Sequence, residues 1–80
     1  MTLRIYGKPD CCLCEKAQRV ADHLQPEFGY EIEHIDITRD PELVVRYGTV
    51  IPVLTLDGVE LVRSHVTISA VRAALAAARG

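Results

Sequence analysis

Apolar residues recur with two different periods along this 80-residue chain, and the periods predict its elements. Leu3 and Ile5 alternate with polar neighbours, which predicts a strand over Thr2–Tyr6. Residues 7–10, Gly-Lys-Pro-Asp, are typical of a turn. After this turn, one face of a helix is marked by Leu13, Ala17, Val20 and Leu24. Pro26 then ends the helix, or at least its regular part.

A second strand is predicted over Tyr30–Ile37. Its two isoleucines, Ile32 and Ile35, fall on opposite faces of an extended chain. Either both faces of this strand are covered or its register shifts near His34, and the sequence leaves the choice open.

A short helix follows this strand. Asp40 can cap it, and Pro41 suits its first turn. Glu42 favours the positive end of the helix dipole, and Gly48 suits the exit. These signals together predict a short helix that begins after Asp40 and ends near Gly48.

The last third of the chain predicts a hairpin and a final helix. Two apolar runs, Val53–Leu56 and Val59–Val62, flank Asp57-Gly58, a pair typical of a two-residue hairpin turn. We expect Thr67 to cap the final helix and Gly80 to close it. The apolar face of that helix is marked by Ile68, Val71, Leu75 and Ala78.

The predicted order is therefore β-α-β-α-β-β-α in a single domain over residues 1–80. Strands joined through a helix should be parallel by a right-handed crossover, and the hairpin strands antiparallel. A four-stranded mixed sheet with helices on its faces is the compact solution for this order.

Composition excludes several classes of function. A formal charge of −2 and a pI near 5.8 argue against nucleic acid as a partner, because phosphate binding needs a basic face. No apolar run is long enough to span a membrane, and the first ten residues lack the apolar core of an export signal. We therefore expect a monomer in the reducing cytoplasm, where three cysteines should not form a static disulfide framework.

The cysteines are crowded into residues 11–14, Cys-Cys-Leu-Cys. A disulfide between adjacent Cys11 and Cys12 would close a strained ring, and Cys12 and Cys14 point in different directions on a helical turn. Cys11 and Cys14 lie three apart, so they can overlap in the first turn. Three cysteines could simply pack in a core, but a strand–turn–helix context favours a redox pair at Cys11 and Cys14, with Cys12 as a bystander or regulatory thiol.

Placement at a helix N-terminus gives this pair its chemistry. Free amides there stabilise a thiolate, so Cys11 can be an exposed nucleophile with a lowered pKa. Cys14, one turn in, is more covered and can attack the resulting mixed disulfide. Lys8 should favour the thiolate and Asp10 should oppose it, and the sequence does not say which charge lies closer.

The sequence resembles the glutaredoxin-like branch of the thioredoxin superfamily, in particular small bacterial proteins with a Cys-x-Leu-Cys segment. The resemblance rests on residues 5–14 (IYGKPDCCLC), residues 47–54 (YGTVIPVL) and the Asp57-Gly58 hairpin. It implies a thioredoxin-like, three-layer α/β/α fold and a thiol–disulfide oxidoreductase. It also implies that Pro52 follows a cis peptide bond and faces the cysteine pair, where the Ile51 backbone can pair with an extended substrate.

The sequence departs from typical glutaredoxins after its last strand. The Gly-Gly turn that holds glutathione is absent, and Arg63, Ser64 and His65 stand near that place. We expect these three residues, with Lys8, Ile51 and Pro52, to line the substrate groove. We expect no bound cofactor; glutathione stays open as the reductant, and the substrate is a protein or small-molecule disulfide.

Two other functions compete with an enzyme. The fold could be a redox sensor or partner-binding module whose disulfide turns over no substrate. Metal binding through Cys11, Cys14 and His65 ranks behind it, since no second Cys-x-x-Cys or paired histidine motif supplies four ligands. The family resemblance also allows an iron–sulfur cluster that bridges two copies through Cys11 and glutathione, but the missing glycine pair weighs against it. We expect His23 and His34 to be surface residues, and no metal site is predicted.

Overall fold

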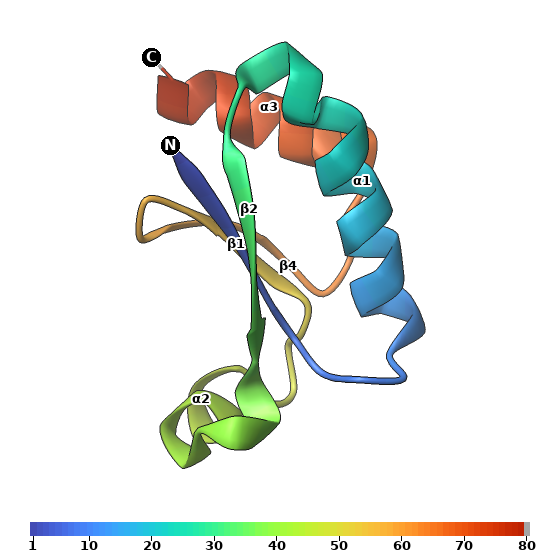
Figure 1. Cartoon of the computed structure of the whole chain (residues 1–80), viewed down its shortest axis with the longest axis vertical. Helices are drawn as coiled ribbons and strands as arrows, with labels where there is room; N and C mark the ends of the chain where they lie inside the picture. Colours follow the sequence, from blue (N-terminus) through green and yellow to red (C-terminus); the bar gives the residue numbers. More distant parts are fainter. Residues whose placement is uncertain (80) are drawn as a thin grey trace.

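The computed structural model describes residues 1–79 and contains the predicted strands and helices in the predicted order (Figure 1). The elements are β1 (Thr2–Gly7), α1 (Cys12–Phe28), β2 (Glu31–Asp36), the 3₁₀ turn η1 (Ile37–Arg39), α2 (Pro41–Tyr47), β3 (Val53–Leu56), β4 (Val59–Arg63) and α3 (Ile68–Arg79).

The four strands form one mixed sheet in the order β2-β1-β3-β4. β1 is parallel to β2 and antiparallel to β3, and β3 is antiparallel to β4. The predicted parallel pairing across α1 and the predicted hairpin are thus confirmed. Asp57 and Gly58 both have positive φ, 49° and 87°, so the two-residue turn has the backbone that this hairpin requires. The sheet register brings the C-terminal end of β1 beside the beginning of β3.

One face of the sheet carries the core. Leu3 and Ile5 of β1 pair with Leu56 and Leu54 of β3, and all four side chains are buried. This face packs against the buried faces of α1 and α3, contributed by Ala17, Val20, Ala21, Leu24, Val71 and Leu75. Burial of these side chains is the main source of stability for so small a domain.

The opposite face is covered at one end by α2. Tyr6 alternates with Ile5 and so points to this second face, where its ring lies 4.9 Å from the ring of Tyr47 in α2. Two helices on one face and a third on the other make the expected three-layer α/β/α arrangement. In residues 1–79, no helix is both long enough and apolar enough to cross a membrane.

The helix caps agree with the sequence, whereas the predicted end of α1 is wrong. Asp40 accepts from the Glu42 N–H at 3.0 Å, and Thr67 accepts from the Ala70 N–H at 3.2 Å. Helix α1 continues past Pro26 to Phe28 and ends at Gly29, whose φ is 75°. A proline in the last turn removes only one intrahelical hydrogen bond, which is why the helix tolerates it. The predicted exit at Gly80 lies outside the described residues.

β2 is shorter than predicted. It covers Glu31–Asp36, and Ile37 instead begins η1, where Asp36 accepts from the Thr38 N–H at 2.9 Å. The pairing of β1 with β2 is continuous, so no register shift occurs near His34. Ile32 and Ile35 therefore lie on opposite faces, each partly buried, and the strand is covered in part on both sides.

Tyr30, between α1 and β2, is hydrogen-bonded back to α1. Its ring is 2% exposed, and its hydroxyl donates to the Ala21 carbonyl at 2.5 Å. We expect Tyr30→Phe to lower the free energy of unfolding by about 1 kcal/mol, since the ring still fills the core and one hydrogen bond is lost. Urea unfolding followed by circular dichroism measures this, and a loss above about 3 kcal/mol would contradict a role limited to that bond.

Candidate active site

Cys11 is the N-cap of α1, and the cysteines lie at the helix N-terminus as the preceding turn and the following apolar stripe predicted. Its backbone is extended (φ −113°, ψ 111°), its carbonyl accepts from the Glu15 N–H at 3.0 Å, and its sulfur accepts from the Cys14 N–H at 3.3 Å. The sulfur therefore replaces the oxygen of the usual capping residues. A thiolate at this position faces the free amides of the first turn.

Cys14 lies one turn into α1, against the end of β1. A Cβ placed on Gly7 would lie 2.9 Å from the Cys14 sulfur and 3.2 Å from its Cβ. Only a glycine leaves room for Cys14 at this contact. The sheet register, continued by one residue, puts Pro52 beside Gly7, because Tyr6 pairs with Val53. The end of β1 thus brings Cys14 near the beginning of β3.

The pKa of the Cys11 thiol is lowered. Burial acts to raise this pKa, but hydrogen bonds from the Cys14 thiol and from the Cys14 and Leu13 backbone N–H groups outweigh it. The positive charge of Lys8 lowers the pKa further. Lys8 is therefore the charged side chain that favours the Cys11 thiolate, in the direction expected from the sequence.

The pKa of the Cys14 thiol moves the other way, to about 11. Burial is the largest cause, and the hydrogen bond and charge of Cys11 raise the pKa of Cys14 further. A backbone hydrogen bond at Lys8 and the Lys8 charge oppose this only in part. One thiol of the pair is thus prepared to ionise while the other keeps its proton.

The residues between the pair point outward. Cys12 is exposed, and Leu13 is 44% exposed. All three cysteines are free thiols, and Cys11 and Cys14 are half-buried. Cys12 therefore lies off the pair, as its spacing predicted.

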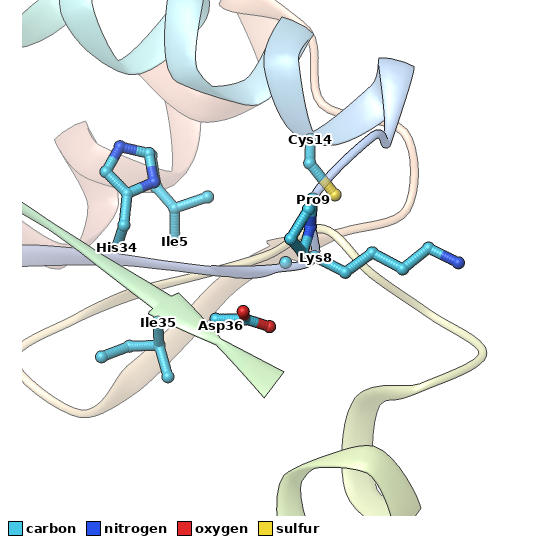
Figure 2. Close-up of a pocket in the computed structure, with 8 residues that line it drawn as sticks. Ile5, Lys8, Pro9, Cys14, His34, Ile35 and Asp36 are labelled. Carbon is cyan, nitrogen blue, oxygen red and sulfur yellow. The ribbon is translucent and has the colours of Figure 1, made fainter. Parts of the chain in front are cut away.

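A pocket of about 220 Å³ opens beside Cys14 on the side of β2 (Figure 2). In Figure 2 the Cys14 sulfur extends from α1 toward Pro9, and His34 lies across the pocket. The Lys8 side chain runs away from His34 into the open. This pocket lies beside the covered thiol of the pair.

The loop before β3 is held by the turn after β4. The Ile51–Pro52 peptide bond is cis. The Ser64 N–H donates to the carbonyls of Val50 at 3.0 Å and Pro52 at 2.9 Å, and the Ser64 hydroxyl donates to Val50 at 3.3 Å. Within residues 1–79, the backbone N–H and carbonyl of Ile51 have no hydrogen-bond partner. Ser64 therefore positions the loop, and Ile51 keeps a free backbone edge.

Arg63 and His65, also predicted to line the groove, have different environments. Arg63 is bidentate to Glu60, at 2.7 Å and 2.5 Å, and this hydrogen bond raises the pKa of Arg63. His65 is exposed, with its backbone N–H bonded to the Arg63 carbonyl at 2.8 Å. Lys8 thus acts on the cysteines through its charge, and Ser64 is hydrogen-bonded to the loop that contains Ile51 and Pro52. The Arg63 guanidinium is instead paired with Glu60 of its own strand.

Several residues at the site were not singled out from sequence. The sequence does contain a signal for Gly7, because a residue without a side chain ends the first strand directly before the turn. His34 is a surface residue, as predicted, yet it borders cavities that also touch Cys14, because the sheet register pairs it with Ile5. Gln18, one turn after Cys14, has a buried side-chain oxygen without a partner in residues 1–79. Nothing in the sequence marks Gln18.

Among the described residues, no three His, Cys, Asp or Glu side chains are grouped so that they could hold a metal ion. Cys11 and Cys14 alone supply two ligands, fewer than structural zinc requires.

Comparisons with known proteins agree with this geometry. A family profile described as Glutaredoxin-like domain (DUF836) matches residues 2–76. The chain belongs to this family. No curated protein matches this glutaredoxin-like chain at a significant level.

Two solved structures share the fold of this glutaredoxin-like domain. One, described as a malarial protein, is 18% identical with a TM-score of 0.67, covering 95% of this chain and 93% of that one. The other is thioredoxin 1 from the thermophilic eubacterium Thermosipho africanus, 18% identical with a TM-score of 0.61 and full coverage of both chains. At this identity the likeness establishes the thioredoxin-like fold.

The opposite pKa shifts in this glutaredoxin-like domain predict a difference in alkylation. As pH rises, reaction of Cys11 with iodoacetamide should reach half its maximum rate below the pH of an ordinary thiol, and reaction of Cys14 only near pH 11. Lys8→Gln should move the Cys11 midpoint upward, because it removes a charge that favours the thiolate. Peptide mapping by mass spectrometry resolves the sites; equal midpoints for Cys11 and Cys14 would contradict the assignment.

Proposed function

We propose that this chain is a thiol–disulfide oxidoreductase that uses Cys11 as nucleophile and Cys14 as resolving thiol. The observation that carries the proposal is the pairing of two thiols one helical turn apart with opposite pKa shifts, Cys11 lowered and Cys14 raised to about 11. Membership of the glutaredoxin-like family supports a redox role for this fold.

In the first step the Cys11 thiolate attacks one sulfur of a substrate disulfide. A bond forms between Cys11 and that sulfur, the substrate S–S bond breaks, and the other substrate sulfur leaves as a thiolate. The lowered pKa of Cys11 supplies the attacking thiolate near neutral pH. The N-cap position keeps this sulfur half-buried and accessible.

In the second step Cys14 attacks the Cys11 sulfur and releases the remaining substrate sulfur as a thiol. Burial raises the Cys14 pKa most, and the charge and hydrogen bond of Cys11 add to it. Because the mixed disulfide removes both contributions of Cys11, the pKa of Cys14 should fall when it is needed as a nucleophile. The products are a Cys11–Cys14 disulfide and a substrate reduced by two electrons.

We expect the substrate to bind along the free backbone edge of Ile51. Its unpaired N–H and carbonyl suit main-chain pairing with an extended polypeptide beside the cysteines. The hydrogen bonds of Ser64 to Val50 and Pro52 hold that edge in place. A protein or peptide disulfide therefore fits the site.

Return of the disulfide to the dithiol state needs two electrons, which two external thiols or one dithiol supply as they are oxidised to a disulfide. We place the reaction in the cytoplasm, where a pool of low-molecular-weight thiols supplies them. Glutathione is a candidate donor, although residues 63–65 replace the glycine pair that holds it in typical glutaredoxins.

Equilibration in dithiothreitol and in glutathione buffers of graded potential, with acid quench and mass spectrometry, tests the redox pair. We expect one reversible two-electron transition with a disulfide mapped to Cys11 and Cys14. Absence of that disulfide under mild oxidation would refute the proposal. If the disulfide forms reversibly but the protein reduces neither insulin nor a peptide disulfide, the chain is a redox sensor and not an oxidoreductase.

A further inference from the structure

Helices α1 and α3 pack against each other (Figure 1). A groove of about 730 Å³ lies between α1 and the beginning of α3. Its floor includes Val20, which is buried, and Ile68, which is 38% exposed. Its rim carries Lys16, Arg19 and His23 from α1 and Arg72 from α3. The redox mechanism above uses none of these side chains.

The charge of this α1–α3 groove is opposite to that of the chain. The protein has a formal charge of −2, yet three of its nine Lys and Arg residues line the groove together with His23, and no Asp or Glu lines it. Arg72 is balanced by Glu27 at 3.3 Å, whereas Lys16 and Arg19 have no ion-pair partner within residues 1–79.

The acidic side chains of the same part of α1 lie elsewhere. Glu15 and Gln18 line a different pocket, which contains Cys11 and Cys14, and Asp22 accepts from the Gln18 amide at 2.7 Å. Arg19 borders both pockets, but neither Glu15 nor Asp22 lines the groove, so the acidic groups of this part of α1 are separated from the cationic rim of the groove. Such a division leaves a cationic surface free for an anionic partner.

The basic side chains form a line that leads away from the redox pair. Lys16, Arg19 and His23 share a stripe with Cys12 at helical spacings of four, three and four residues. At 1.5 Å per residue, they lie about 7 to 18 Å along the helix from Cys11. An extended polypeptide advances about 3.3 Å per residue, so it would cover that distance with about two to five residues.

We propose that the α1–α3 groove binds an acidic segment of a polypeptide disulfide substrate, with Asp or Glu about two to five residues from the cysteine that Cys11 attacks. This inference rests on the proposed exchange reaction and names its substrate class. The length of the cationic line and its apolar floor fit an extended chain better than a small anion, which would engage only one or two of these groups.

Two peptides test the groove. Each peptide contains one cysteine, held as a mixed disulfide with 2-mercaptoethanol. One peptide carries three Asp residues two to five positions from this cysteine, and the other carries three Asn residues at the same positions. Reduction should be roughly tenfold faster in kcat/KM for the Asp peptide at 50 mM NaCl, since each exposed ion pair contributes modestly. The difference should shrink at 500 mM NaCl, where the charges are screened.

Lys16→Gln combined with Arg19→Gln should bring the ratio of the two rates close to one. Arg79→Gln is the matched control, because it removes one charge from the opposite end of α3 and should leave the ratio unchanged. Equal rates for the Asp and Asn peptides in the wild type would overturn the groove assignment.

Binding without chemistry separates the two proposals. A fluorescent Asp peptide with serine in place of cysteine should bind the wild type more tightly than the double variant in anisotropy titrations. If neither peptide disulfide is reduced but this selectivity persists, the exchange reaction fails and the groove stands. Single-stranded DNA and unlabelled Asp peptide are compared as competitors of the fluorescent peptide. If the DNA displaces it at the lower concentration, the groove prefers phosphate backbones and the polypeptide assignment fails.

Discussion

Cys11→Ser should abolish reduction of a peptide disulfide, leaving only the rate of the uncatalysed reaction. A serine hydroxyl does not ionise near neutral pH and cannot form a mixed disulfide, so the first step has no nucleophile. The hydroxyl can still cap α1 in place of the sulfur, because serine is a preferred N-cap residue. The fold should therefore survive, and loss of activity can be read as loss of chemistry.

Cys14→Ser should behave differently from Cys11→Ser. The first step still proceeds, but no internal thiol resolves its product, so the mixed disulfide at Cys11 should accumulate. Non-reducing mass spectrometry after addition of substrate measures this species. Cys12→Ser is the matched control, since Cys12 is exposed and off the pair, and it should retain full turnover. Equal activity in all three variants would rule out the dithiol mechanism.

Gly7→Ala should impair the same chemistry from outside the cysteine motif. The added methyl group would lie 2.9 Å from the Cys14 sulfur and 3.2 Å from its Cβ, so Cys14 or the first turn of α1 must move. We expect a loss of about 1–3 kcal/mol in the free energy of unfolding, as for other overpacked sites. Resolution of the mixed disulfide should slow as well, because Cys14 no longer lies in place.

Gly29→Ala separates the effect on Cys14 from lost stability. Gly29 has a φ of 75° and open space around it, so alanine there costs about 1 kcal/mol through backbone strain and touches no cysteine. Its rate of mixed-disulfide resolution in stopped-flow experiments should match the wild type. If Gly7→Ala resolves the mixed disulfide as fast as Gly29→Ala, the contact between Gly7 and Cys14 has no part in the reaction.

Local signals in the sequence were sufficient for the architecture. Asp40, Thr67 and the Asp57-Gly58 turn act through hydrogen bonds and backbone angles within a few residues, so their effects can be deduced from the chain alone. The same holds for Cys11, whose role as N-cap follows from the turn before it and the apolar stripe after it. The end of α1 was misplaced at Pro26, because the free-energy cost of a proline in a helix depends on how near the end of the helix it lies.

The rest of the site depends on contacts between distant segments. The close approach of Gly7 to Cys14 follows from the packing of α1 on β1, and the position of His34 from the pairing of β1 with β2. Ser64 was predicted to meet substrate, whereas its hydroxyl and N–H hold the loop at 50–52. A single sequence contains no direct record of such pairings, so chemistry could be assigned to the cysteines before their surroundings were known.

A single-turnover experiment tests the dithiol mechanism most directly. The reduced protein is mixed with a peptide mixed disulfide, quenched in acid at millisecond to second intervals, and mapped by mass spectrometry. The mechanism predicts a transient peptide adduct on Cys11 that decays as a Cys11–Cys14 disulfide appears at the same rate. An adduct found first on Cys12 or Cys14, or one on Cys11 that never converts, would contradict it.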